Sequence, residues 1–218
     1  MLQPCRIVVL ISGQGTILNA ILSAIKNRPI PAQICAVFSN NADAFGLAYA
    51  EKEGIPARII EPQNYSDRAD YDAALIHEID AFHPDLIVLA GFMRVLTPLF
   101  TRHYIGRLIN IHPALLPAYP GRYTHERVLA AGEKTHGSTV HFVNDVLDGG
   151  PIIAQTSVPV LANDTVETLS QRVKLAEAEL YPTVIDWFAT QRLVLKENVV
   201  YLDGKKLPVQ GIMHALNS

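Results

Sequence analysis

The run CRIVVLISGQGT at residues 5–16 decides which fold this sequence can adopt. After Arg6 the run is continuously apolar up to residue 11, as in a parallel strand that is buried on both faces. A turn containing two glycines follows, and apolar residues then recur at the spacing of a helix. These residues are Ile17, Leu18, Ile21, Leu22 and Ile25. A strand, a turn and a helix in this order predict the start of an α/β fold.

The same alternation of strand-like and helix-like segments continues along the chain. Further strands are predicted at residues 32–38, 58–60, 85–90 and 106–112. Helices are predicted at about residues 43–53 and 67–83, with a short helical segment after residue 97. The pattern predicts a doubly wound, mostly parallel sheet whose N-terminal half is of the Rossmann type.

The glycine turn at residues 12–16 is a candidate anion site. Backbone amides at the start of a helix lack partners within the helix, and the helix dipole favours an anion there. The dinucleotide fingerprint would need a third glycine where this chain has Leu18, and no Walker lysine follows. The turn therefore indicates a site for a single phosphate, and the alternative is an ordinary tight turn.

A second apolar run, GRLINIHPALLP at residues 106–117, carries Asn110 and His112 two positions apart. Alternate residues of a strand point to the same side, and Pro113 ends the strand. Both side chains are therefore predicted at the carboxyl edge of the sheet, where open α/β sheets bind ligands. An amide can stabilise an oxyanion and an imidazole can move protons, so the pair suits acyl transfer. The alternative is a histidine that only caps a turn.

The second half departs from the alternation of strands and helices. Strand-like runs at residues 135–143 and 152–160 predict a hairpin, and the loop between them carries Asp148 before two glycines. Asp164 and Thr165 are predicted to cap a long helix at about residues 166–190. The tail at residues 193–207 predicts a terminal β-hairpin with a turn at Asp203-Gly204.

Composition excludes several classes of protein. A chain of 218 residues with 49% hydrophobic and 18% charged residues can bury one substantial core. A net charge of −3 argues against a nucleic-acid binder that works by neutralising phosphates. Cys5 and Cys35 give neither a metal-binding spacing nor a disulfide framework, so the expected compartment is the cytoplasm. No apolar run is long enough to predict a membrane span, and the first six residues show no secretory pattern.

Several motifs together resemble one enzyme family. They are VLISGQG, AVFSN, GLAYA, LAGFMRVL, LINIHPALLP, HGSTVHFV and LDGGPI. The combination is similar to the phosphoribosylglycinamide formyltransferases, the folate-dependent enzymes of purine biosynthesis, over essentially the whole chain. The resemblance implies transfer of the formyl group of 10-formyltetrahydrofolate to the glycine amine of phosphoribosylglycinamide. The alternatives are a formyltetrahydrofolate hydrolase, another folate-dependent N-formyltransferase and a non-catalytic nucleotide or folate binding module.

The resemblance also implies the organisation of the protein. It implies one formyltransferase domain at residues 1–218, with a phosphate-binding half at 1–105 and a catalytic and folate-binding half at 106–218. The two small molecules are the expected partners, with no nucleic acid and no membrane, and the chain is expected to be a monomer or a homodimer. Neither a tightly bound cofactor nor a metal is expected.

Site residues follow from the resemblance by position. The implied catalytic residues are Asn110, His112 and Asp148. The implied phosphate-binding residues are Gly15, Thr16 and Ile17, and Glu177 is the implied contact to the glycinamide. The implied folate-binding residues are Arg68, Met93, Arg94, Val95, Leu96 and Asn110. Many relatives have Gly-Ser-Asn at the positions of residues 15–17, and Gln14 stands where asparagine is common.

Asp148 would favour the protonated form of His112, and neither cysteine lies near these motifs, so direct transfer without an acyl-enzyme is expected. Three further residues stay undecided between structural and functional roles. They are His141, His125 and Lys174.

Overall fold

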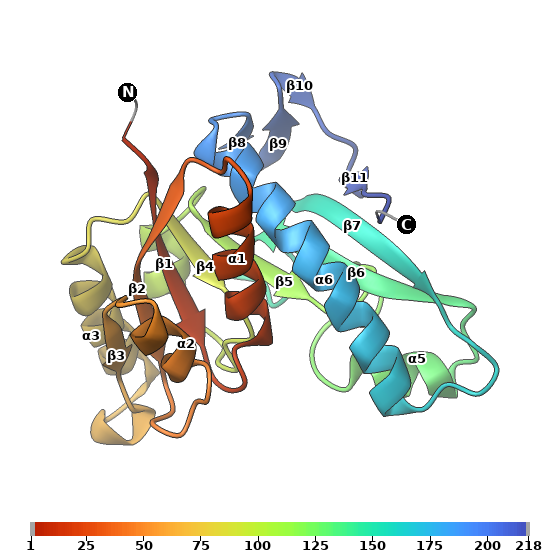
Figure 1. The fold of residues 1–218 in the computed structure, drawn as a ribbon, viewed down its shortest axis with the longest axis horizontal. Coiled ribbons are helices and arrows are strands. Elements are labelled where there is room, and N and C mark those ends of the chain that lie inside the picture. The colour runs from red at the N-terminus through yellow and green to blue at the C-terminus, as the bar shows by residue number, and fades with distance from the viewer. Residues whose placement is uncertain (1–2, 217–218) are drawn as a thin grey trace. The chain divides into compact units, whose positions relative to one another are not determined.

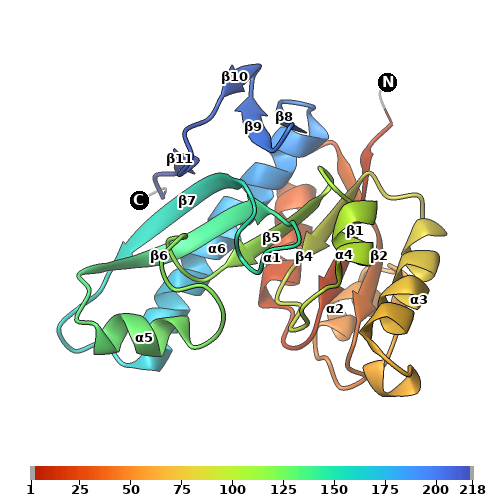
Figure 2. The same cartoon turned by 180° about the vertical axis from the view of Figure 1, so that it is seen from behind.

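A computed structural model describes residues 3–216 of the chain. The chain forms two compact units, Met1–Asn110 and Ile111–Ser218. Strand β5 (Leu108–His112) contains the boundary, so it ends the first unit and begins the second. Figure 1 labels most elements of both units, and Figure 2 also labels α4.

The first unit is a parallel sheet with the strand order β5-β4-β1-β2-β3. Its other strands are β1 (Cys5–Ile11), β2 (Ala32–Ser39), β3 (Ala57–Ile59) and β4 (Leu86–Leu89). Its helices are α1 (Thr16–Asn27), α2 (Leu47–Lys52), α3 (Arg68–Asp80) and α4 (Pro98–His103), with a 3₁₀ turn at Pro62–Asn64. Figures 1 and 2 show α1 on one face of this sheet and α3 and α4 on the other, which confirms the doubly wound arrangement.

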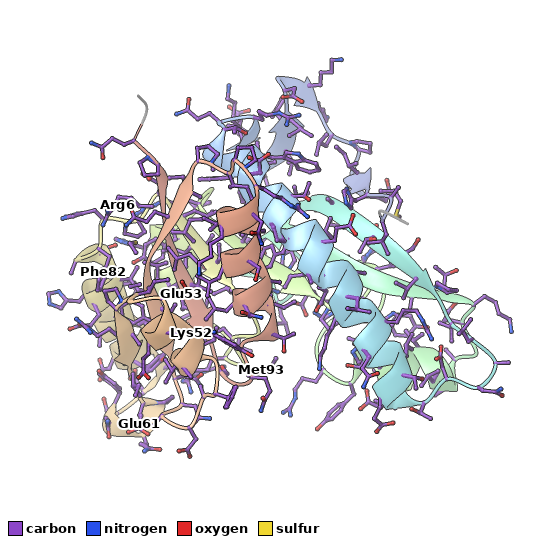
Figure 3. The ribbon with its side chains drawn as sticks, viewed as in Figure 1. Arg6, Lys52, Glu53, Glu61, Phe82 and Met93 are labelled. Atoms are coloured by element: carbon purple, nitrogen blue, oxygen red, sulfur yellow. The ribbon has the colours of Figure 1, made fainter. Side chains whose placement is uncertain are left out.

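Burial explains why the apolar runs form these strands. Residues 7–11 of β1 are fully buried, as a strand covered by helices on both faces requires. The Arg6 side chain at the start of β1 donates to the carbonyl oxygen of Phe82, with Nη2 at 2.6 Å (Figure 3). Helix α3 begins where Asp67 accepts hydrogen bonds from the amides of Ala69 and Asp70.

The second unit contains the predicted hairpin of β6 (Thr135–Phe142) and β7 (Ile152–Pro159), which pair antiparallel. Strand β11 (Ile212–Met213) pairs parallel to β7, and the helices are α5 (Thr124–Ala130) and α6 (Val166–Ala189). Thr165 accepts from the Thr168 amide, so the predicted cap of the long helix is confirmed. One cluster of buried side chains holds α5, α6 and β7 together: Val128, Val158, Leu169, Val173 and Ala176.

The tail of the second unit is a small antiparallel sheet of β8 (Leu193–Lys196), β9 (Val199–Leu202) and β10 (Lys205–Lys206). The turns at Glu197-Asn198 and Asp203-Gly204 have positive φ at both residues, as type I′ hairpin turns do. The sequence predicts the Asp203-Gly204 turn but not the Glu197-Asn198 turn.

The predicted boundaries agree with the structure to within one or two residues, with two larger differences. The helix expected to begin near residue 43 begins at Leu47, because no side chain caps it and Gly46 precedes it. The helix expected to reach about residue 83 ends at Asp80. Among residues 3–216, no helix is long and apolar enough to cross a lipid bilayer.

Candidate active site

His112 and Asp148 come together in the second unit. His112 is the last residue of β5, and Asp148 lies in the loop between β6 and β7. His112 Nδ1 lies 3.4 Å from Asp148 Oδ2, and the two side chains are only 6% and 8% exposed. His112 Nε2 lies 2.9 Å from the carbonyl oxygen of Tyr119, which can only accept a hydrogen bond. Both ring nitrogens therefore face acceptors, so a doubly protonated imidazolium would donate to both.

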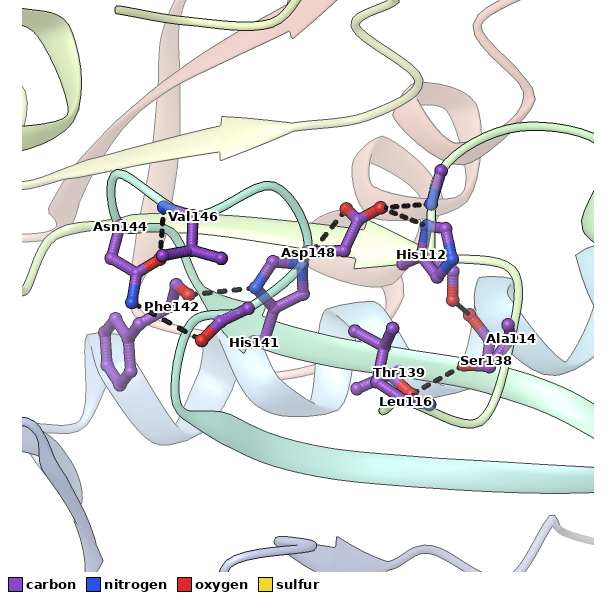
Figure 4. A network of polar contacts seen from close by, with 12 residues as sticks. His112, Ala114, Leu116, Ser138, Thr139, His141, Phe142, Asn144, Val146 and Asp148 are labelled. Atoms are coloured by element: carbon purple, nitrogen blue, oxygen red, sulfur yellow. Dashed lines mark hydrogen bonds and ion pairs between the residues drawn. The ribbon is translucent and has the colours of Figure 1, made fainter. Parts of the chain in front are cut away.

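One hydrogen bond fixes the Asp148 carboxylate, and a second histidine lies beside it. Its Oδ2 accepts from the backbone amide of Gly121 at 2.8 Å, and its Oδ1 lies 3.9 Å from His141 Nε2. Figure 4 shows the carboxylate between the two histidines. The backbone of Asp148 has a φ of 50°, in the left-handed region that non-glycine residues seldom adopt. The loop thus fixes the carboxylate beside His112 in a strained conformation.

His141 is undecided from the sequence, and the structure places it against Asp148. It is buried on β6, and its Nδ1 lies 2.9 Å from the carbonyl oxygen of Phe142. Burial lowers the pKa of His141, which favours the neutral ring. Nδ1 then carries the proton that is donated to Phe142, and Nε2 faces the carboxylate.

Asn110 lies two residues before His112 on β5, so both belong to the same side of that strand. In the first unit its backbone pairs with Leu89 of β4. The predicted spacing of amide and imidazole on one strand is therefore present.

Glu177 is buried on α6 and is connected to β5 through one hydroxyl group. Ser138 Oγ lies 2.9 Å from Glu177 Oε1 and 2.8 Å from the carbonyl oxygen of His112. A hydroxyl has one proton to donate, and the carbonyl can only accept. Burial raises the pKa of Glu177 to about 7. A protonated Glu177 that donates to the Ser138 hydroxyl, which in turn donates to the His112 carbonyl oxygen, gives each of these two contacts one donor and one acceptor.

The candidate phosphate loop lies in the first unit at the start of α1. Gly15 is the residue before the helix, with a φ of 70°, and no side chain caps the helix amides. Thr16 is exposed, whereas the side chain of Ile17 is buried. The amides of the first turn have no partners within the helix, so they are what the loop offers to an anion.

The candidate folate residues other than Asn110 lie in the first unit, on α3 and on the loop that follows β4. Arg68 is exposed in the first turn of α3, and Met93 and Val95 expose apolar side chains. The Arg94 guanidinium lies over the ring of Tyr71, 4.4 Å from its centroid. Leu96 is half-buried.

Comparisons with known proteins agree on one family. The sequence profile of the formyl transferase family matches residues 5–185. The phosphoribosylglycinamide formyltransferase of Escherichia coli (strain K12) is 53% identical over 206 residues, which cover 94% of this chain and 97% of that protein. Its counterpart from Haemophilus influenzae is 47% identical with the same coverage. The solved structure of phosphoribosylglycinamide formyltransferase from Coxiella burnetii, in complex with CHES, has a TM-score of 0.93 and 50% identity, covering 97% of this chain and 100% of that chain.

The chain belongs to the phosphoribosylglycinamide formyltransferase family. The family resemblance and the fold predicted from the motifs are thereby confirmed. Membership in this formyltransferase family supports a folate-dependent transferase over a hydrolase or a non-catalytic binding module.

In this formyltransferase the other two undecided residues are also placed. His125 Nδ1 lies 3.0 Å from His136 Nε2, so it links α5 to β6, and no side chain caps the start of α5. Lys174 is exposed on α6. Within the described part of the chain, no three His, Cys, Asp or Glu side chains gather as a metal site would require.

Two partners of His112 in this formyltransferase are not predicted from the sequence. They are the Tyr119 carbonyl, which lies 7 residues further along the chain, and the Ser138 hydroxyl, which comes from β6. A weak signal exists for Ser138, because it follows Gly137 within the motif HGSTVHFV. Nothing in the sequence marks a particular carbonyl group as a partner.

Proposed function

We propose that this protein transfers the formyl group of 10-formyltetrahydrofolate to the glycine amine of phosphoribosylglycinamide, a step of purine biosynthesis. The observation that carries the proposal is 53% identity to the Escherichia coli enzyme over nearly the full length of both chains. The pairing of His112 with Asp148 at the end of β5 supports it chemically, because such a pair can stabilise a developing oxyanion.

The reaction follows from the properties of these side chains. The neutral glycine amine attacks the formyl carbon and forms a tetrahedral centre with a negative oxygen and a positive nitrogen. Asn110 donates its amide hydrogen to that oxygen. His112, when it is protonated, donates more strongly by turning its Nε2–H from the Tyr119 carbonyl to that oxygen, while Nδ1–H stays on Asp148. Asp148 stabilises the imidazolium and helps a proton pass from the attacking nitrogen to the folate nitrogen that leaves. The C–N bond to the folate then breaks, and no bond to the enzyme forms.

Substrate recognition completes the proposal. The backbone amides of Gly15, Thr16 and Ile17 bind the phosphate, which is consistent with the buried side chain of Ile17. Arg68 and the residues Met93, Arg94, Val95 and Leu96 bind the folate, together with Asn110. Glu177 contacts the glycinamide.

The remaining assignments are part of the same proposal. Residues 1–105 form the half that binds the phosphate and contributes Arg68 and the run Met93–Leu96 to the folate site, and residues 106–218 form the catalytic half, which contributes Asn110 to the folate site. The folate is a co-substrate, and no cofactor is tightly bound. The enzyme acts in the cytoplasm as a monomer or homodimer, without nucleic-acid or membrane partners.

A steady-state assay tests the function directly. Formation of tetrahydrofolate is measured with and without phosphoribosylglycinamide, in the wild type and in His112→Ala. The wild type should form product only when the amine is present, and His112→Ala should lose at least about two orders of magnitude in turnover while remaining folded. Equal formate release with and without the amine would instead identify a hydrolase.

A further inference from the structure

The loop at residues 91–97 is attached to the rest of the first unit by side chains outside the loop. Near its start, the backbone amide of Met93 donates to Ser12 Oγ at 2.7 Å. At its end, the amide and the hydroxyl of Thr97 both donate to Asp72 Oδ2 at 2.7 Å. Asp72 is buried on α3. The loop backbone is therefore fixed at two separate points.

Two apolar side chains of this loop are unusually exposed for their type. Met93 is 76% exposed and Val95 is 48% exposed. Apolar side chains held outward by an anchored backbone are preorganised to cover an apolar ligand. This agrees with the proposed role of the loop in binding the folate.

Ser12 connects this loop to the candidate phosphate loop. It directly follows β1 and begins the glycine turn. Its hydroxyl accepts from the Met93 amide and donates to Asn40 Oδ1 at 2.5 Å. The carbonyl of the next residue, Gly13, accepts from the amide of Gly46 at 3.0 Å. The segment at residues 12–13 therefore binds the loop at residues 91–97 and also forms the start of the candidate phosphate loop.

We infer that Ser12 is a positioning residue through which the phosphate-bearing substrate and the folate strengthen each other's binding. The inference rests on the proposed function, which assigns one substrate to each loop. A phosphate held by the amides of residues 15–17 restricts the segment that begins at Ser12. The Met93 amide then keeps its acceptor, so the folate meets a loop that is already ordered, and the effect is reciprocal.

The test measures this coupling without turnover. Tetrahydrofolate, which carries no formyl group, is titrated calorimetrically into the protein with and without saturating phosphoribosylglycinamide. In the wild type, the amine substrate should tighten tetrahydrofolate binding by at least about fivefold. In Ser12→Ala the factor should fall below about twofold, because the Met93 amide has lost its acceptor. Ser12→Thr retains a hydroxyl and should retain the coupling.

Thr97→Val is the matched control. This substitution weakens the anchor between Thr97 and Asp72 at the end of the same loop. That anchor has no hydrogen bond to the glycine turn. It should weaken tetrahydrofolate a few-fold both with and without phosphoribosylglycinamide, and the coupling factor should stay at the wild-type value. Hydrogen exchange of the Met93 amide in the wild type gives a second readout, since it should slow at least about fivefold when phosphoribosylglycinamide alone is bound.

Three results would overturn the inference. They are unchanged coupling in Ser12→Ala, no coupling in a wild type that binds both ligands, and unchanged exchange at Met93. A wild type that binds neither ligand would overturn the proposed function and the inference together, so the two failures can be told apart.

Discussion

The Glu177 carboxyl group lies in the interior of the second unit, where ionisation is costly. Burial raises its pKa to about 7 from an ordinary value of 4.5. The folded chain therefore binds this proton more tightly than the unfolded chain does. The resulting stabilisation is complete below about pH 4.5 and is lost as the pH rises through about 7.

Replacing Glu177 by glutamine should remove this dependence on pH. The new carboxamide can donate to Ser138 as the protonated acid does, and it does not ionise. Between pH 5 and pH 8, the free energy of unfolding of Glu177→Gln should rise relative to the wild type by about 2–3 kcal/mol. Urea unfolding of both proteins at several pH values measures the difference. A difference that does not vary with pH would mean that the carboxyl group is not buried as a neutral acid.

Gly15 occupies a position that a side chain would disrupt. A Cβ there would lie 2.4 Å from the Cα of Gly46, and the φ of 70° disfavours other residues. Gly15→Ala should therefore cost at least about 2 kcal/mol of stability and raise the KM for phosphoribosylglycinamide. Gly13→Ala is the control, because a Cβ on Gly13 meets no atom within 4 Å. Thermal unfolding and substrate kinetics of the two variants should differ clearly, and equal behaviour would contradict the close approach of Gly15 to Gly46.

The sequence predicts those site residues whose spacing along one strand or one motif is informative. Asn110 and His112 are predicted together because two positions on a strand share a side. The Tyr119 carbonyl and the Ser138 hydroxyl are not, because the first reaches His112 through the irregular loop after β5 and the second comes from the distant strand β6. His141 cannot be assigned either, since a buried strand histidine looks the same in sequence whether or not it meets a carboxylate.

The contact between α5 and β6 depends on two histidines. His125 and His136 are joined by a hydrogen bond between ring nitrogens, and their rings meet edge to face. Burial lowers the pKa of both, and that of His136 falls to about 4. Because the folded pKa lies below the unfolded value of 6.5, the stability is complete above about pH 6.5 and is lost as the pH falls toward 4.

Acid should therefore loosen α5 before it affects elements without buried histidines. Between pH 7 and pH 5, the wild type should lose about 2 kcal/mol that His136→Gln does not lose, because glutamine does not titrate. Urea unfolding gives the free energies, and hydrogen exchange in residues 124–130 locates the loss. If the free energies of unfolding of the two proteins changed in parallel with pH, His136 would not be the cause of the loss in stability.

Elements with a strong local pattern are predicted well from the sequence, and elements that depend on their neighbours are not. The buried apolar run of β1 is predicted with its observed bounds of residues 5–11. The short helix α2 is predicted too early, because it has no side-chain cap and its start is fixed by the packing of Gly46 against Gly15. The Glu197-Asn198 turn escapes prediction because neither residue is glycine, although both adopt positive φ.

The reactivity of the two cysteines measures whether the first unit is folded. Cys5 and Cys35 lie on β1 and β2, and both are buried. Burial raises the pKa of Cys5 to about 12 and also raises that of Cys35. The reactive thiolate is therefore scarce in the folded protein.

Iodoacetamide at pH 8 should react with the folded protein at least about a hundredfold more slowly than with glutathione, and activity should persist. In denaturant both thiols should react, so the extent of alkylation should follow the fraction of unfolded chain. Mass spectrometry counts the labels. Rapid alkylation of the folded protein with loss of activity would instead support a thiol-based mechanism.

At position 148, the residue that would best stabilise the left-handed backbone differs from the residue that the reaction needs. Glycine would relax this backbone, and relief of such strain is worth about 1 kcal/mol. The same change would take away the carboxylate that faces His112. A screen for thermostable variants that measures only the melting temperature would therefore favour glycine at position 148 and yield an inactive protein. Any such screen must select for turnover as well.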